Sequence, residues 1–271
     1  MDRPVELSEA GARPSTVTGA VHDRLRNDIL LGEWRPDDRL KLDRLKSRYA
    51  ASINTLREAL SRLVSEGLVA NEGQRGFMVV GASLADLRDI TEMRALLECQ
   101  AARRSIERAD LEWESRIVGA YHKLSKIEEL IASDPQRHAP QLEIYNREFH
   151  SALIANCGSK WLQVFHGVMY DQSLRYRMLA FKVRDFPREQ SRREHKQILE
   201  AALARDSDRL TELLSAHIGK GADLYVETDL VEATPAGKAR PVASSASRGK
   251  LKAKAGPAKR GRRGSTQALP T

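Results

Sequence analysis

The sequence predicts a mainly α-helical fold, with three helices and a short β-hairpin first and an all-α antiparallel bundle after them. Three observations lead to this prediction. Apolar residues recur at helical spacing through most of the 271-residue chain. Strand-like runs are confined to one pair before Gly81. Aromatic residues make up only 5% of the chain, so its cores must rest on aliphatic side chains, a composition that favours helices.

Changes in composition divide the chain into four parts. Residues 1–16 are polar, contain two prolines and read as a flexible arm. Residues 17–82 hold the strand signal, and residues 83–232 carry only helical patterns. Residues 233–271 are rich in Ala, Gly, Pro, Ser, Lys and Arg, so they bury too little apolar surface to offset chain entropy. We expect this tail to be disordered.

The net charge of +8 is a property of that tail. It carries ten of the 45 Lys and Arg residues and no Asp or Glu, which leaves 35 basic and 37 acidic residues elsewhere. The overall charge is therefore no evidence that the folded part binds nucleic acid. The basic tail either adds salt-sensitive DNA affinity or only solubilises the chain.

Several classes of protein are disfavoured by what the sequence lacks. Cys99 and Cys157 stand in apolar helical contexts and do not suggest a disulfide framework. The first twenty residues contain no apolar signal-peptide core, and no apolar run approaches the roughly 18 residues needed to cross a membrane. We expect a cytoplasmic protein without a membrane partner.

The elements of the first segment follow from apolar spacing and from stop signals. A first helix ends near Gly32 with Pro36 beyond it, and a third begins after Ser52, a good N-cap. Short strands at 68–70 and 77–80 flank a turn that contains glycine. The helices are marked by Leu25, Ile29 and Leu30, then Leu42, Leu45 and Tyr49, then Leu56, Leu60, Leu63 and Val64.

The order of three helices and a hairpin is typical of a winged helix-turn-helix. The third helix has one apolar face, and its polar face near the start suits the major groove. The turn of the hairpin suits a wing on the DNA backbone. The candidate DNA-binding residues are Arg44, Ser52, Asn54, Thr55, Arg57, Gln74 and Arg75. Two alternatives are a helical subdomain whose charged face is merely solvated, and a winged helix used for protein contacts.

Residues 19–82 resemble the winged helix of the GntR family of transcriptional regulators. The matching stretches are RLR (24–26), ILLGEWRP (29–36), LREALSRL (56–63), EGLV (66–69) and QRGF (74–77). The chain departs from the family in having Asp37 where Gly is usual and Ile53 where an arginine often reads a base. The resemblance therefore implies operator binding in which base reading shifts to Asn54 and Thr55.

Ser83 and Asp86 have the spacing of a capping box and open the helical part. We expect its helices at 84–108, 110–133, 141–157, 159–182, 187–206 and 206–227. Asp134–Pro135 and Phe186–Pro187 are the clearest breaks between them.

Three histidines and one amide in this part could hold a metal ion. His150, His195 and His217 each lie in an expected helix, and Asn146 shares a helix face with His150. Imidazoles and an oxygen ligand converging inside a bundle suit Zn²⁺ or a similar divalent ion. Scattered histidines in a helical protein are, however, more often simply packed or exposed.

Residues 84–228 resemble the ligand-binding domain of the FadR branch, the all-helical FCD type. The matching stretches are RALLE (94–98), NREFH (146–150), CGSKWL (157–162) and EHKQIL (194–199), and 157–177 is most similar to the branch with the carbon-starvation-induced regulators. The resemblance implies a divalent metal, zinc in our interpretation, on Asn146, His150, His195 and His217. Asn in place of an acidic ligand should lower the affinity.

The same resemblance implies a small organic-acid effector. Arginine binds a carboxylate bidentately, so Arg94, Arg175 and Tyr176 are the candidate effector-binding residues, with Arg177 as a weaker one. The alternative is that these arginines pair with acidic side chains across helices.

These features together predict a homodimeric repressor that binds an inverted repeat and is released by its effector. Activation remains an alternative outcome. A metal-dependent enzyme in a helical bundle is the rival class, but the chain has no HExxH, GxSxG, P-loop or CxxC motif.

Overall fold

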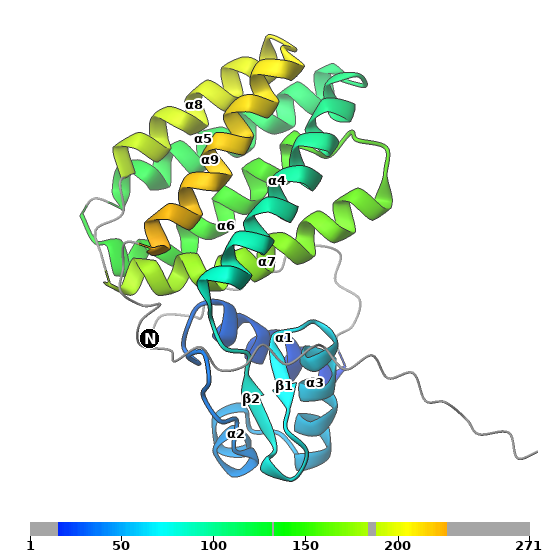
Figure 1. Cartoon of the computed structure of the whole chain (residues 1–271), viewed down its shortest axis with the longest axis vertical. Coiled ribbons are helices and arrows are strands. Elements are labelled where there is room, and N and C mark those ends of the chain that lie inside the picture. The colour runs from blue at the N-terminus through cyan, green and yellow to red at the C-terminus, as the bar shows by residue number, and fades with distance from the viewer. Residues whose placement is uncertain (1–15, 132, 184–187, 227–271) are drawn as a thin grey trace, which may run out of the picture. The chain divides into compact units, whose positions relative to one another are not determined.

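The computed structural model describes residues 16–131, 133–183 and 188–226. The expected arm, the break at Phe186–Pro187 and the basic tail lie outside the described residues, apart from Thr16. Within the described part the fold is mainly helical, as the sequence predicts (Figure 1).

The first elements form a winged helix-turn-helix. Helices α1 (Val17–Leu30), α2 (Leu42–Tyr49) and α3 (Ile53–Ser65) precede strands β1 (Val69–Asn71) and β2 (Phe77–Val79). The Thr16 hydroxyl accepts from the Gly19 amide and caps α1, and Ser52 does the same for α3 through the Thr55 amide. These caps satisfy amides that a helix leaves free in its first turn.

The wing is a two-stranded antiparallel hairpin closed by a short 3₁₀ turn, η1 (Gly73–Arg75). Its register pairs Val69 with Val79 and Asn71 with Phe77. Gly76 has φ +82°, a conformation that side chains rarely adopt, which explains the glycine between η1 and β2. Arg39 forms an isolated bridge to Met78, so the chain before α2 extends the edge of the hairpin.

The core of the winged helix is aliphatic with one buried polar pair. The Trp34 indole donates to the Tyr49 hydroxyl at 2.9 Å, and that hydroxyl donates to Asp28 at 2.6 Å. The pair therefore keeps its polar atoms satisfied inside an apolar core. The leucines with no exposed surface are Leu25, Leu30, Leu45, Leu56, Leu60 and Leu63.

Six described helices follow the wing. They are α4 (Leu84–Ile106), α5 (Leu111–Leu130), α6 (Pro135–Leu153), α7 (Lys160–Val183), α8 (Arg188–Leu203) and α9 (Ser207–Val226). Helix α4 packs on α7 and α9, α5 packs on α6 and α8, and α8 packs on α9 (Figure 1). The bundle thus brings α4, α6, α8 and α9, the helices with the expected metal ligands and Arg94, around a common interior.

One helix boundary differs clearly from the prediction. The sequence predicts a start near 141, but α6 begins at Pro135 and includes Pro140. Asp134 caps this helix through the Arg137 amide, and Pro135 occupies the first turn, where its missing N–H costs nothing. Asp134–Pro135 does end the preceding helix, since α5 stops at Leu130.

None of the helices in the described ranges is long and apolar enough to span a bilayer.

Candidate DNA-binding surface and metal centre

The start of α3 presents a polar surface. Asn54 and Arg57 are exposed, and they lie opposite the face of α3 that packs on α1 and α2. The hydroxyls of Ser52 and Thr55 lie 2.9 Å apart, and Ser52 also accepts from the Thr55 amide at 3.2 Å. Asn54 and Arg57 are therefore the freer side chains for reaching DNA. Ile53 is 41% exposed at the same turn.

The remaining candidates flank this helix. The Arg44 guanidinium lies over the Trp34 ring, 4.4 Å from its centroid, and its side chain is exposed. Gln74 and Arg75 are exposed in the turn of the wing, where Arg39 donates to the Arg75 carbonyl. The structure thus places all seven predicted residues in α2, the start of α3 and the wing.

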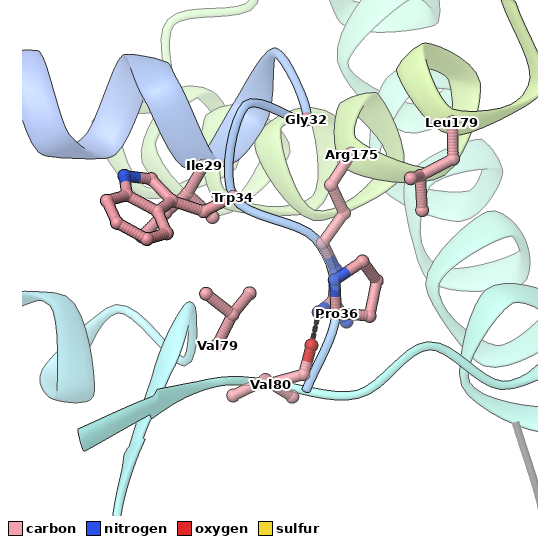
Figure 2. Close-up of a pocket in the computed structure, with 8 residues that line it drawn as sticks. All are labelled: Ile29, Gly32, Trp34, Pro36, Val79, Val80, Arg175 and Leu179. Atoms are coloured by element: carbon pink, nitrogen blue, oxygen red, sulfur yellow. Dashed lines mark hydrogen bonds between the residues drawn. The ribbon is translucent and has the colours of Figure 1, made fainter. Parts of the chain in front are cut away.

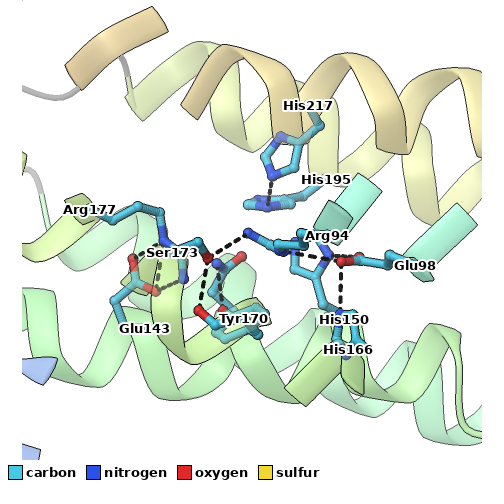
Figure 3. Close-up of polar contacts among 11 residues, drawn as sticks. Arg94, Glu98, Glu143, His150, His166, Tyr170, Ser173, Arg177, His195 and His217 are labelled. Atoms are coloured by element: carbon cyan, nitrogen blue, oxygen red, sulfur yellow. Dashed lines mark hydrogen bonds and ion pairs between the residues drawn. The ribbon is translucent and has the colours of Figure 1, made fainter. Parts of the chain in front are cut away.

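The three predicted histidines converge in the bundle. One nitrogen from each of His150 (α6), His195 (α8) and His217 (α9) lies within 4.8 Å of the other two. His195 Nε2 and His217 Nε2 are 3.1 Å apart, and the rings of His150 and His217 stack at 5.5 Å (Figure 3). His150 has no exposed surface, and His195 is buried.

A carboxylate holds the Nδ1 atom of each histidine. Glu98 contacts His150 Nδ1, Glu128 lies 2.6 Å from His195 Nδ1, and Glu194 lies 2.8 Å from His217 Nδ1. A carboxylate at Nδ1 favours the tautomer that carries its proton there and leaves Nε2 free as a ligand. His150 Nε2 has no hydrogen-bond partner among the described residues, and the Nε2 atoms of His195 and His217 contact each other, so the three histidines offer nitrogens within one small space.

The surroundings keep His150 and His217 neutral. Burial lowers the pKa of His150 to about 3, although Glu98 opposes that shift. Burial and the nearby His195 lower the pKa of His217 to about 4, against the effect of Glu194. Neutral imidazole is the form that coordinates metals, so both residues are in the binding form at physiological pH.

Asn146, the fourth predicted ligand, lies close to His150. It is on α6, one turn before His150, and its Nδ2 donates to the Tyr170 hydroxyl at 3.0 Å. Its Oδ1 is buried without a hydrogen-bond partner among the described residues, and so is His150 Nε2. Unsatisfied buried acceptors are costly, and a divalent cation would satisfy both. Three imidazoles and one amide oxygen are a donor set that suits Zn²⁺ or a similar ion.

Arg94 is the predicted effector residue that reaches this region. Its side chain is buried on α4, donates to Glu98 at 3.2 Å, and lies 4.4 Å from the centroid of the Tyr170 ring. Arg94 Nη1 is 3.5 Å from the Ser173 hydroxyl (Figure 3), while Nη2 is buried without a partner in the described part. A buried guanidinium nitrogen with a free N–H suits an anionic ligand.

Arg175 and Tyr176 contact a different part of the chain. Arg175 donates to the Val80 carbonyl at 3.1 Å and to Asp86 at 2.7 Å, and the Tyr176 hydroxyl also contacts Asp86. Figure 2 shows Arg175 in a small pocket formed with Ile29, Gly32, Trp34, Pro36, Val79, Val80 and Leu179. The expectation that both residues face the effector with Arg94 is thus corrected, because they hold the connection between β2 and α4. Arg177 pairs with Glu143 at 2.7 Å.

The backing carboxylates were not among the predicted site residues. Glu98 follows Arg94 by one helical turn, which is a detectable signal. Glu128 and Glu194 carry no such signal: Glu194 precedes His195 in sequence but binds His217. Their roles depend on packing between helices, which spacing within one helix does not reveal.

Comparisons with known proteins agree with this geometry. Residues 18–79 match the family described as bacterial regulatory proteins, gntR family, and residues 89–220 match the FCD domain family. The chain is 45% identical over 199 residues to the uncharacterized HTH-type transcriptional regulator BphR of Paraburkholderia xenovorans, covering 73% of this chain and 81% of the relative. It is 36% identical over 197 residues to the HTH-type transcriptional repressor GlaR of Escherichia coli, covering 72% and 89%.

A solved structure of E. coli McbR/YncC has the same fold. It superposes with a TM-score of 0.66 at 19% identity and covers 78% of this chain and 98% of that one. The exposed start of α3, the wing and these matches give one conclusion: the chain belongs to the GntR family and is a DNA-binding transcriptional regulator with an FCD domain, not an enzyme.

Proposed function

We propose that this regulator is a homodimeric, metal-binding repressor that leaves its operator when a small carboxylate binds in the helical domain. The observation that carries the proposal is a set of ligand atoms that converge in one interior. They are one nitrogen from each of the three histidines, together with Asn146 Oδ1 and Arg94 Nη2. Among them, His150 Nε2, Asn146 Oδ1 and Arg94 Nη2 have no hydrogen-bond partner in the described part of the chain, and a divalent cation and an anion would satisfy them together.

The metal, zinc or a similar ion, would be held by His150, His195, His217 and Asn146. When bound, it supplies positive charge and a coordination position for a carboxylate oxygen. Arg94 would bind the anion through its free Nη2 atom, while Glu98 and Ser173 hold the rest of the guanidinium. Arg175 and Tyr176 are not part of this proposed effector site.

The repressor role is supported by the 36% identity to a protein named as a transcriptional repressor. DNA binding would use Asn54 and Arg57 at the start of α3, with Arg44, Gln74 and Arg75 on the phosphate backbone and Ser52 and Thr55 positioning the helix. An inverted repeat places two recognition helices in successive major grooves, which requires two copies of the chain.

The second copy would cover an exposed apolar surface on α4 and α7. We call this the α4–α7 face: Met93, Leu96, Trp161, Val164, Phe165 and Val168, all at least 39% exposed. The four residues on α7 recur at intervals of three and four, so they form one stripe. Exposed apolar stripes such as the one on α7 mark protein interfaces, and aromatic residues commonly anchor them.

DNA binding and release test the regulator function directly. Purified protein is titrated onto the upstream region of its own gene at several salt concentrations, with and without a panel of small carboxylates. We expect a sequence-specific shift that weakens with salt and that one class of carboxylate reverses. If a carboxylate strengthened the shift, the effector would promote DNA binding instead of releasing it, and the release mechanism would be wrong. If the upstream region bound no more tightly than random DNA, the proposed operator would be refuted.

Elemental analysis tests the metal separately. A His150→Ala, His195→Ala double variant should lose the metal that the wild-type protein carries. His122→Ala is the matched control, because His122 is an exposed histidine on α5. Equal metal content in the wild type and the double variant would refute the site.

A further inference from the structure

Glu98 has more partners in the site than the other two carboxylates. It is on α4, has no exposed surface, and contacts three separate groups (Figure 3). Oε1 contacts His150 Nδ1, and Oε2 lies 2.9 Å from His166 Nε2 and 3.2 Å from Arg94 Nε. One carboxylate therefore joins an expected metal ligand to the expected anion-binding arginine.

Glu128 and Glu194 do not make this connection. Glu128 Oε1 holds His195, and its Oε2 is buried without a partner among the described residues. Glu194 holds His217, and its second oxygen contacts Lys220 at 2.5 Å and Gln190 at 3.0 Å. Among the described residues neither carboxylate forms a hydrogen bond or ion pair with Arg94, so Glu128 offers a matched comparison for Glu98.

We propose that Glu98 is a positioning residue that couples metal binding at His150 to anion binding at Arg94. This inference rests on the proposed metal and effector site. Glu98 fixes the His150 proton on Nδ1, which leaves Nε2 for the metal. The same carboxylate binds Arg94 through Nε, which leaves Nη2 for the anion.

The chemistry of the carboxylate explains why glutamine cannot replace it. A carboxylate only accepts hydrogen bonds, whereas an amide has one accepting oxygen and one donating nitrogen. Three N–H groups converge on Glu98 when His150 and His166 carry protons on the nitrogens that face it. In Glu98→Gln, one end of the amide must oppose an N–H group. Either the His150 tautomer changes or Arg94 loses its anchor.

The His150 tautomer tests the first half of the proposal without any metal. Nitrogen NMR of the histidine rings in metal-free full-length protein should show a changed protonation pattern for His150 in Glu98→Gln. Glu128→Gln should change His195 and leave His150 as in the wild type. An unchanged His150 pattern in Glu98→Gln would overturn the role of Glu98 in fixing the His150 proton.

Metal and anion binding test the coupling. Zn²⁺ affinity is measured against a chromophoric chelator, and acetate is titrated onto the Co²⁺-loaded protein while its visible spectrum is recorded. Both Gln variants should bind Zn²⁺ about 10–100-fold more weakly. At saturating Co²⁺, only Glu98→Gln should also bind acetate at least fivefold more weakly. Equal acetate binding by the two variants would refute the coupling.

Two further outcomes also decide the proposal: a Glu98→Gln variant that does not fold, and a wild-type protein that binds no metal. If Glu98→Gln does not fold, Glu98→Asp takes its place. It keeps the charge but shortens the reach, so it should weaken acetate binding relative to Glu128→Gln, and equality would refute the coupling. A wild-type protein that binds neither Zn²⁺ nor Co²⁺ would refute the proposed metal site and the coupling with it, whereas the tautomer measurement would still report on Glu98 alone.

Discussion

Asn54 and Arg57 face solvent from the same turn of α3 but have different chemistry. The Asn54 amide can pair with an adenine edge, which depends on the base, whereas the Arg57 guanidinium suits a phosphate, which does not. Asn54→Ala should therefore reduce discrimination between operator and mutated operator by about 1–3 kcal/mol. Arg57→Gln should weaken all DNA binding and lower the salt slope by about one.

Fluorescence anisotropy with operator and mutated operator at three salt concentrations separates these two roles. The exposed Ser61, also on α3, provides the control variant Ser61→Ala. If Asn54→Ala weakened binding to both DNA sequences equally, its role would be on the backbone rather than in base reading.

His22 gives the winged helix a pH-dependent contact. Its Nε2 lies 2.5 Å from Glu66, which raises the pKa of His22 against the opposing effect of burial. Burial acts to raise the pKa of Glu66, but its hydrogen bonds to His22 and Arg26 outweigh burial and lower that pKa. A raised histidine pKa means that the folded state binds the proton more tightly than the unfolded state does. The contact therefore contributes fully to the free energy of unfolding below about pH 6.5. The contribution is lost as pH rises through the pKa of His22 in the folded state.

His22→Gln tests this pH dependence. At pH 6 the variant should melt about 2–4 °C below the wild type, and the difference should shrink as pH rises toward 9. Differential scanning fluorimetry from pH 6 to 9 measures both curves, with the exposed His122→Gln as control. A difference that stays constant over that range would show that packing, not charge, accounts for the effect.

At the scale of elements, α7 contacts both the candidate site and the winged helix. Tyr170 and Ser173 face the candidate site through Asn146 and Arg94. Residues between and after them bind the winged helix: Asp171 contacts Arg26 of α1, Gln172 donates to the Glu66 carbonyl, and Arg175 donates to the Val80 carbonyl. One rigid helical segment therefore contacts both the proposed effector site and the DNA-binding elements.

Arg175→Met tests the contribution of this contact. The substitution keeps the apolar stem but removes the bonds to Val80, Gly81 and Asp86. Asp86 keeps its contact with the Tyr176 hydroxyl, but leaving the Val80 and Gly81 carbonyls unpaired should destabilise the protein by about 1–3 kcal/mol. Because Arg175 is not at the histidine cluster, the metal content should not change. Thermal melting and elemental analysis measure both quantities, with Arg192→Met as the surface control. If Arg175→Met lost the metal, Arg175 would contribute to the metal site.

The elements could be predicted because their signals are local. Ser52 caps α3, glycines sit in the wing, and apolar spacing marks the buried faces of the helices. The start of α6 was predicted too late, at 141, because Asp134–Pro135 was interpreted only as a break, whereas these residues supply the cap and the first turn of α6. A proline in the first turn of a helix loses no helical hydrogen bond, and apolar spacing does not reveal such a start.

Helix placement and spacing single out Asn146 and the three histidines as possible ligands, but they do not favour a metal site over scattered histidines. The resemblance to a family made the site the preferred prediction, and the structure brings the histidines together. Arg175 was misplaced because sequence proximity to Arg177 says nothing of the direction in which each side chain points. Glu98, Glu128 and Glu194 depend on contacts between helices, so no pattern in the sequence pairs them with their histidines.

At the scale of the whole molecule, the proposed dimer rests on the exposed α4–α7 face. A standard interface buries about 800 Å² on each side, with aromatic residues as frequent anchors. Trp161 is 64% exposed, Phe165 is 52% exposed, and the two rings stack at 5.8 Å. A two-fold symmetric interface brings the same surface of each copy together.

A Trp161→Glu, Phe165→Glu double variant tests this arrangement. Symmetry would bring like charges together in place of apolar contacts, so the variant should be monomeric at micromolar concentration. Because a monomer contacts only one half-site, operator affinity should fall at least tenfold, while the metal content stays the same. Light scattering, anisotropy and elemental analysis give the three readouts. Leu111→Glu is the matched control, since Leu111 is 77% exposed on α5 and outside the α4–α7 face. If the double variant remained a dimer, the α4–α7 face would not be the dimer interface.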